Sequence, residues 1–401
     1  MDLQSGKLYW PTTITNKPTY LPLDDDLTCD VLIVGGGSSG AQAAYYLSQL
    51  DMNIIVIDKR DVGAGSTSTN TALLQYSGDK MFFELVSTFG EERSARHLKL
   101  CQKAIDDIEI ASKKLPYHSH FTRRDSLYFS SSLEDVEKID KEYHLLKKHG
   151  FDVTYFTKEQ IKEHYPFYAP AAIYSFNDGE LNPLAFTYGL LEKAKDNGVK
   201  IFANTELVRK KFCDDYVQFF TNNQKSIKAK YVIFTAGYEN LEFKKEKNTT
   251  ISSSYAIVTQ PLENFWYNRT LIWETARPYM YMRTTHDNRI IIGGLDETTA
   301  FVDRRDSMLI HKRDQLVRDF NQLFPSIHIK PDYYLAAFYG GTHDGMPILG
   351  MYDDHPNCYF IYGYGDNGLV YSTVLTQIIR DLIHKGSSDN VDLYIQSRPQ
   401  L

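Results

Sequence analysis

The hydrophobic positions near the start of the chain follow a recognisable order. Residues 31–34 form an unbroken apolar run, a helical pattern follows, and a second apolar run ends at Asp58. A strand that is apolar on both faces is typical of a parallel sheet covered by helices on both sides. This segment therefore predicts a strand, a turn, a helix and a second parallel strand.

The order of apolar and polar positions changes twice along the chain. Beyond residue 116 the strand and helix alternation stops, and four later segments alternate like antiparallel strands, namely 254–259, 270–274, 278–284 and 289–294. Patterns typical of buried strands and amphipathic helices return in three places, namely 184–203, 231–237 and 358–382. We therefore expect a parallel-sheet domain that is interrupted by an antiparallel one.

Composition limits the class of protein. A chain of 401 residues exceeds the roughly 250 to 300 residues at which a single core stops growing, so two domains are expected. The net charge of −7 argues against a nucleic-acid partner. The four cysteines lack metal-ligand spacing, so no metal site is expected. No apolar run reaches about 18 residues and no secretion signal is present, which predicts a cytoplasmic protein that is not integral to a membrane.

A glycine turn joins the first strand to its helix. Gly35 allows a tight turn, Gly37 lets a diphosphate approach the backbone, and Gly40 lets the helix pack closely on the strand. The helix then directs its free N-terminal amides at the diphosphate. Asp58, at the end of the second strand, can accept hydrogen bonds from ribose hydroxyls. The order of these parts predicts a dinucleotide site, for which a nicotinamide cofactor is as suitable as a flavin.

Two other segments are candidate binding loops. Residues 62–72 are dense in small and hydroxyl side chains, which suits either a loop folded around a flat ligand or a flexible linker. A second glycine turn, residues 363–368, precedes a helix and again aims helix amides at one point. A purely structural turn would also account for its glycines.

These pieces together resemble the D-amino-acid oxidase and sarcosine/glycine oxidase superfamily of FAD enzymes. The resemblance rests on the first glycine turn with Asp58, the strand 289–294, and residues 342–350 leading to the second glycine turn. It extends from Asp30 to about Ile383. Residues 279–289 are especially similar to the gamma-glutamylputrescine oxidase branch.

The resemblance implies an α/β fold in which a Rossmann-like FAD-binding domain carries an inserted α+β substrate domain with an antiparallel sheet. The flavin ring is expected between the two. We place the FAD-binding domain at residues 1–115, 170–245 and 330–401, and the substrate domain at 116–169 and 246–329. The arm before residue 28 is expected to lie over the surface.

The resemblance also implies which residues bind FAD. Related enzymes with a covalent flavin use a cysteine or a histidine at the places that hold Ala337 and Asn70 here, so noncovalent binding is expected. The amides of the second glycine turn are expected near the flavin C2 carbonyl, where they stabilise the anionic reduced ring. The expected cofactor contacts are Gly35, Gly37, Ser38, Ser39, Gly40, Asp58, Lys59, Gly65, Ser66, Thr67, Thr69, Asn70, Val208, Gly237, Gly365, Asn367, Gly368 and Leu369.

Four residues are candidates for the catalytic site. In the strand 279–284, Tyr281 and Arg283 emerge on one face and the two methionines on the other. Arg283 suits a substrate carboxylate, or equally an internal partner such as Glu274. His343 is either a proton acceptor or a structural histidine beside an aspartate. Tyr281 and Tyr339 are pocket walls or ordinary core.

The function expected from these residues is FAD-dependent oxidation of a small amine or amino acid at its C–N bond, with hydride transfer to flavin N5. The alternatives are a 2-hydroxy-acid or glycerol-phosphate dehydrogenase with a quinone acceptor, and a nicotinamide-binding module. The substrate is thus a small amine or carboxylate. Sarcosine oxidases carry a lysine that speeds reaction with oxygen where this chain presents Ile291, which leaves oxygen or a quinone as acceptor.

Overall fold

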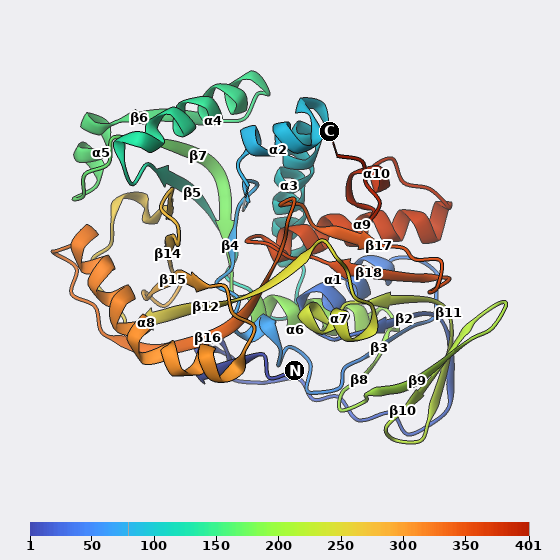
Figure 1. Cartoon of the computed structure of the whole chain (residues 1–401). Helices are drawn as coiled ribbons and strands as arrows, with labels where there is room; N and C mark the ends of the chain where they lie inside the picture. Colours follow the sequence, from blue (N-terminus) through green and yellow to red (C-terminus); the bar gives the residue numbers. More distant parts are fainter. Residues whose placement is uncertain (79, 401) are drawn as a thin grey trace.

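The computed structural model describes residues 1–78 and 80–400 and contains two β-sheets with helices packed around them (Figure 1). One sheet has eight strands and the other has ten. The expected combination of a parallel and an antiparallel sheet is confirmed.

The eight-stranded sheet contains the predicted glycine-turn unit. Its strands lie in the order β17 (Ile348–Gly350), β18 (Cys358–Tyr362), β11 (Ser226–Phe234), β2 (Leu27–Val34), β3 (Ile54–Ile57) and β8 (Lys200–Phe202). From β18 to β8 the strands run parallel, whereas β17 joins β18 antiparallel. The unpredicted hairpin of β9 (Leu207–Phe212) and β10 (Val217–Thr221) pairs with β11.

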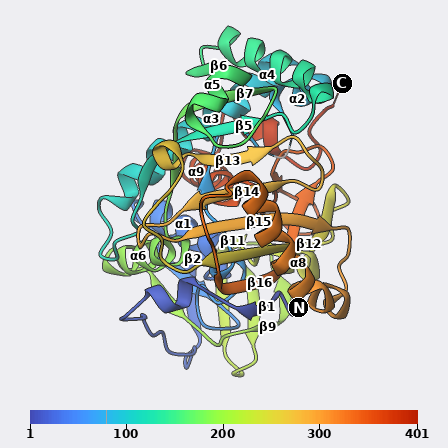
Figure 2. The same ribbon diagram turned by 90° about the vertical axis from the view of Figure 1, so that its left-hand side faces the viewer.

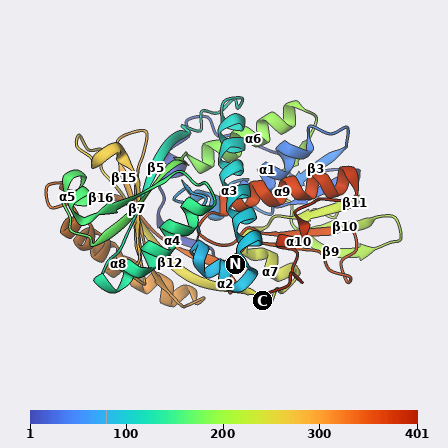
Figure 3. The same ribbon diagram turned by 90° about the horizontal axis from the view of Figure 1, so that it is seen from above.

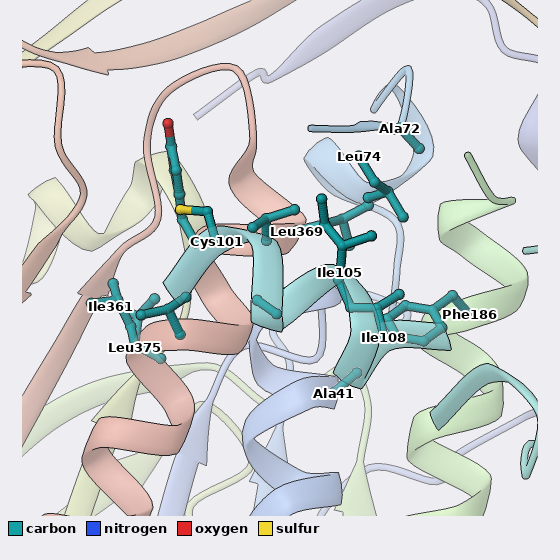
Figure 4. Close-up of a cluster of buried hydrophobic side chains, with 14 of the residues drawn as sticks. Ala41, Ala72, Leu74, Cys101, Ile105, Ile108, Phe186, Ile361, Leu369 and Leu375 are labelled. Carbon is teal, nitrogen blue, oxygen red and sulfur yellow. The ribbon is translucent and has the colours of Figure 1, made fainter. Parts of the chain in front are cut away.

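Helices α1 (Ser38–Leu47), α6 (Pro183–Asp196) and α9 (Gly368–Lys385) pack together beside this sheet. Helix α3 (Glu91–Ser112) runs between the two halves of the molecule (Figure 3) and follows α2 (Phe82–Phe89). Its apolar stripe, which includes Cys101, Ile105 and Ile108, is fully buried against α1 and α9 (Figure 4). The same hydrophobic core contains residues of both sheets, such as Ile33 and Ile291.

The ten-stranded sheet is largely antiparallel. Figure 2 shows most of its strands stacked in the order β7 (Ala171–Glu180), β5 (Thr122–Phe129), β13 (Leu271–Glu274), β14 (Met280–Thr284), β15 (Ile290–Glu297), β12 (Thr249–Thr259), β16 (Pro331–Thr342) and β1 (Gln4–Lys7). The short β4 (Leu73–Leu74) and β6 (Val153–Thr157) both pair with β7. Helix α8 (Val302–Leu323) covers one face, and α4 (Val136–Lys148) and α5 (Lys158–His164) lie near β6.

The pleat of β14 agrees with the sequence. Met280 and Met282 are buried in the core beneath α8, on the opposite face from Tyr281. Helix α8 contributes Leu316 and Phe320 to the same core.

The sheet membership of four strands differs from the expected domain boundaries. β1, β4, β7 and β16 lie in the ten-stranded sheet, although their residues were assigned to the FAD-binding segments. The N-terminal arm is therefore a sheet strand in part, because Gln4 to Lys7 pair with residues 334–337 of β16. These pairings join residues far apart in sequence, so no local pattern reveals them.

Candidate functional site

A cavity of about 440 Å³ lies between the two sheets. Its wall combines the first glycine turn, the loop 65–71, the second glycine turn, and side chains from β12, β14 and β16. Segments that the sequence singled out separately thus meet around one space.

The first glycine turn forms one end of this cavity, together with Ser38, Ser39 and Lys59. Gly35 has φ +111°, and a Cβ there would lie 2.6 Å from the carbonyl oxygen of Thr235, so the turn demands glycine. A Cβ on Gly37 would have Thr67 Oγ1, at 3.2 Å, as its single neighbour within 4 Å. The turn therefore leaves its backbone open to a ligand at Gly37.

Asp58 lies on the wall of the same end. Its Oδ2 accepts a hydrogen bond from the Gly36 N–H at 2.7 Å, and its Oδ1 accepts one from the Arg60 N–H at 2.8 Å. Burial raises the pKa of Asp58 to about 6, although the two backbone bonds act to lower it. A partly buried carboxylate fixed in this way is suited to receive hydroxyl donors such as those of a ribose.

Several residues at this end were missed by the sequence. Glu239 is buried and pairs with Arg60 Nη2 at 2.7 Å, with Lys59 Nζ at 3.1 Å and with the N-terminal amine of Met1 at 2.8 Å. Thr205, Glu206 and Leu207 also line the cavity. No sequence motif marks them, because they reach the site through the folding of distant segments.

The loop that follows β3 is ordered around the cavity. Gly65, Ser66, Thr67, Thr69 and Asn70 all line it. Thr67 Oγ1 accepts a hydrogen bond from the Ser38 N–H at 2.9 Å, which fastens the loop to the start of α1. The interpretation as a flexible linker is therefore wrong.

The N-terminal arm holds this loop from the other side. Gln4 Nε2 donates to the Ala64 carbonyl and to Ser68 Oγ, both at 3.0 Å. Trp10 Nε1 donates to the Asn70 carbonyl at 2.7 Å, and Leu3 lines the cavity itself. The arm is part of the binding site, a role that the sequence did not indicate.

The cavity has the parts that FAD requires. An open glycine turn suits a diphosphate, Asp58 suits a ribose, and the small-residue loop opposite Gly365 and Gly368 suits a flat ring. Gly237 and Ala337 also line it. Individual contacts of these residues with FAD remain predictions.

Four of the expected cofactor residues lie elsewhere. Gly40 packs helix on strand, since a Cβ there would lie 1.8 Å from the Gly35 carbonyl oxygen. Val208 is 62% exposed, and its neighbour Leu207 lines the cavity instead. The Asn367 side chain accepts from the Gln75 N–H at 3.3 Å and donates to the Ser77 carbonyl. Leu369 is buried in the helical core (Figure 4).

The other end of the cavity is aromatic and acidic. Tyr279, Tyr281, Tyr339 and Trp273 form walls there, with Asp296 and Asp366. Asp366 Oδ1 accepts hydrogen bonds from the Tyr279 hydroxyl at 2.6 Å and the Tyr339 hydroxyl at 2.9 Å. A Cβ on Gly293 would lie 2.4 Å from the Tyr281 ring, so glycine is required for that ring to lie flat across β15.

Asp296 is one of the functional candidates that sequence reasoning missed. It is at the end of β15, and its Oδ1 is buried without a hydrogen-bond partner. Burial raises the pKa of Asp296 to about 6; Asp366 raises it further, whereas Ser254, Lys312 and Arg277 lower it. An aspartate at a strand end is ordinary in a sequence, so only the cavity distinguishes this one.

Arg283 does not face the cavity as expected. Its Nε donates to the Thr71 carbonyl at 2.6 Å, its Nη1 to the Thr284 carbonyl at 3.0 Å and its Nη2 to the Leu181 carbonyl at 2.8 Å. Glu180 Oε2 lies 3.6 Å from Nη1. The guanidinium is thus committed to protein groups behind the loop, which corrects the expected carboxylate anchor in favour of an internal partner, Glu180 rather than Glu274.

His343 and Ile291 also lie away from the cavity wall. His343 is exposed in the loop after β16, so it is not placed to accept a proton from a substrate in the cavity. Ile291 is buried in the core. Of the expected catalytic residues, the structure brings Tyr281 and Tyr339 together at the aromatic end.

Neither a helix with the length and apolarity of a membrane span nor a group of three or more potential metal ligands occurs among the described residues.

Comparison with known proteins adds to this geometry. Residues 30–382 match the family model DAO, described as FAD dependent oxidoreductase. Gamma-glutamylputrescine oxidoreductase of Escherichia coli (strain K12) is 21% identical over 96% of this chain and 90% of its own length.

Solved structures share the fold. L-proline dehydrogenase from P. horikoshii superimposes with a TM-score of 0.77 at 19% identity, covering 94% of this chain and 98% of that one. Glycine oxidase from Geobacillus kaustophilus also has a TM-score of 0.77, at 17% identity, covering 90% and 96%.

Proposed function

Because the chain belongs to the DAO family of FAD dependent oxidoreductases, we propose that it oxidises the C–N bond of a small amine or amino acid by hydride transfer to flavin N5. The observation that carries this proposal is the single cavity that joins the glycine turn and Asp58 to an aromatic and acidic end. A cofactor and a small substrate can therefore meet in one cavity.

The chain's own residues hold and orient the reactants. The amides after Gly37 receive the diphosphate, and Asp58 receives the ribose hydroxyls. The turn at Gly365 and Gly368 presents backbone to the ring, where amides stabilise negative charge. Bound FAD supplies the hydride-accepting chemistry. Tyr279, Tyr281 and Tyr339 wall the substrate and limit its contact with water.

The reaction balances without a protein nucleophile. A C–H bond on the carbon that bears the nitrogen breaks, its electron pair leaves as hydride, and the nitrogen lone pair forms a C=N bond. Water then hydrolyses the imine to a carbonyl compound and releases the amine nitrogen. Oxygen or a quinone would accept the electron pair at the end of the reaction.

Oxidation of a 2-hydroxy acid or glycerol phosphate is the main alternative, and it requires a cation that binds the substrate's negative charge. Within the described chain, the lysine and arginine of the cavity wall are Lys59 and Arg60, at the Asp58 end. The aromatic end carries two carboxylates instead, so amine oxidation is favoured.

The test is anaerobic mixing of the yellow protein with amines, amino acids, 2-hydroxy acids and glycerol phosphate. We expect the flavin absorption to bleach with an amine or an amino acid. Bleaching by the hydroxy acid or the phosphate alone would contradict the proposal. A preparation that dithionite reduces and that no amine or amino acid reduces would contradict it too.

A further inference from the structure

The aromatic end of the cavity has an unbalanced set of charges. Asp296 and Asp366 both line it. The cations of the cavity wall in the described chain, Lys59 and Arg60, are near Asp58, where both pair with Glu239. A ligand that enters the aromatic end therefore meets negative charge.

One oxygen of the Asp296 carboxylate lacks a donor, although Ser254 hydrogen-bonds to this carboxyl group. Asp296 Oδ1 is buried and accepts no hydrogen bond, and a buried acceptor without a partner is costly. A bound ligand with N–H donors would supply the missing bond. Asp366 lines the same cavity, and two tyrosine hydroxyls fix its Oδ1.

We propose that this end of the cavity selects substrates that present an ammonium group to Asp296 and Asp366 and carry no carboxylate on the carbon to be oxidised. The inference rests on the proposed function and names its substrate class. The walls of Trp273, Tyr279, Tyr281 and Tyr339 suit the same ligand, since aromatic faces attract cations. A diamine would use one nitrogen for binding while the other is oxidised.

The neighbouring cations are committed elsewhere. Lys312 Nζ donates to the Leu295 carbonyl at 2.9 Å and pairs with Glu297 at 2.6 Å. Arg283 is bound to backbone carbonyls. Arg277 is on the exposed segment before Tyr279, with its guanidinium 4.9 Å from that ring and Nη1 on three carbonyls, of Glu274, Thr275 and Ala276. Among the described residues near this end, Arg277 is thus the competing anchor for a substrate carboxylate.

The experiment uses two ions of opposite charge that share a tert-butyl group. tert-Butylammonium and pivalate differ in their charged group, and neither has a hydrogen on the carbon next to it, so binding is measured without turnover. Each is titrated into the FAD-loaded protein, and the change in flavin absorption gives its dissociation constant. We expect tert-butylammonium to bind at least about tenfold more tightly than pivalate, the scale of one charged hydrogen bond.

Three variants sharpen the result. Asp296→Asn should weaken tert-butylammonium by about tenfold or more and leave pivalate unweakened. Asp303→Asn removes one negative charge from the exposed start of α8 and should change neither constant. Arg277→Met should leave the ammonium constant unchanged; loss of strong pivalate binding in this variant would identify Arg277 as a carboxylate anchor and overturn the inference.

Other outcomes are equally decisive. Tighter binding of pivalate, binding of neither ion, or an Asp296→Asn constant equal to the wild type would overturn it. The comparison of the two ions in the wild type stands even if Asp296→Asn fails to fold. Tight tert-butylammonium binding without flavin bleaching by any amine would support ammonium recognition and contradict only the oxidation proposed above.

Discussion

The Asp58 carboxylate accepts hydrogen bonds from the backbone and also lines the cavity. It fixes the amides of Gly36 and Arg60 while facing the space expected to hold the adenosine ribose. Asp58→Ala should weaken FAD binding by about 1.5 to 3 kcal/mol, the scale of hydrogen bonds to a charged group. Titration of the apoprotein with FAD measures the change.

The pKa of about 6 adds a pH signature to this prediction. The ionised carboxylate is the form that accepts hydroxyl donors, so its contribution to affinity is present above about pH 6 and is lost as the pH falls below it. The Asp58→Ala affinity should lack that component. Asp61→Ala is the matched control, because Asp61 is exposed and pairs with Lys17; equal losses in both variants would refute a specific role for Asp58.

Individual side chains also mark the limit of sequence reasoning. The alternation of β14 correctly separated Tyr281 from Met280 and Met282. It could not reveal that Arg283 donates hydrogen bonds to the carbonyls of Thr71 and Leu181, since both carbonyls belong to distant segments. Asp296 was missed for a related reason, because its unpaired oxygen is a property of the assembled cavity.

Among whole elements, those with local signals were predicted well. Strand β2, the glycine turn and helix α1 follow one another directly along the chain, and α6 and α9 are each one continuous segment. β1 and β16 were not, because their pairing is not local: β1 pairs with β16 more than 300 residues away, and β16 also pairs with β12. The contacts between the N-terminal arm and the loop 64–70 could therefore be recognised only from the structure.

The role of β1 can be tested through Gly6, which has φ +103° and leaves no room for a side chain. A Cβ there would lie 2.3 Å from the Tyr334 carbonyl oxygen, so Gly6→Ala should detach β1 from β16. The two Gln4 hydrogen bonds to the loop would be lost, at about 1 kcal/mol each, and the FAD dissociation constant should rise roughly tenfold.

Gly198→Ala is the control that distinguishes the effect of backbone strain from the effect of detaching β1. Gly198 has φ +98° and nothing within 4 Å of its Cβ position. Both variants should lose stability, by about 1 kcal/mol or more, because alanine is strained at a positive φ. Calorimetry and FAD titration of the same samples measure the two effects. An FAD constant that changes equally in both variants would show that β1 does not support the loop.

Across the whole molecule, one buried ion pair secures the crossing between the two sheets. The loop after β16 leads from the ten-stranded sheet to β17 of the eight-stranded one, and it contains Asp344. Arg398 Nη2 donates to Asp344 Oδ1 and Oδ2, both at 2.7 Å, and Nη1 donates to the Pro347 carbonyl at 2.9 Å. The last part of the chain thus fastens the link on which the cavity between the sheets depends.

Arg398→Met should therefore destabilise the protein by about 3 to 5 kcal/mol near neutral pH, because it leaves a buried carboxylate unpaired. In the wild type, burial acts to raise the pKa of Asp344, but the Arg398 guanidinium holds it below the usual 3.8. The pair's contribution to stability is thus complete above about pH 3.8 and is lost as the pH falls through the folded-state pKa of Asp344.

Without Arg398, burial should raise the pKa of Asp344, so the variant gains relative stability as Asp344 takes up a proton. The stability difference should accordingly narrow as the solution is acidified from about pH 7 to about pH 4.5. Urea unfolding across that range measures it, with Arg318→Met on the exposed face of α8 as a control that should show no such trend. A difference that stays constant with pH would mean that the cost of Arg398→Met lies in packing and not in the charge of Asp344.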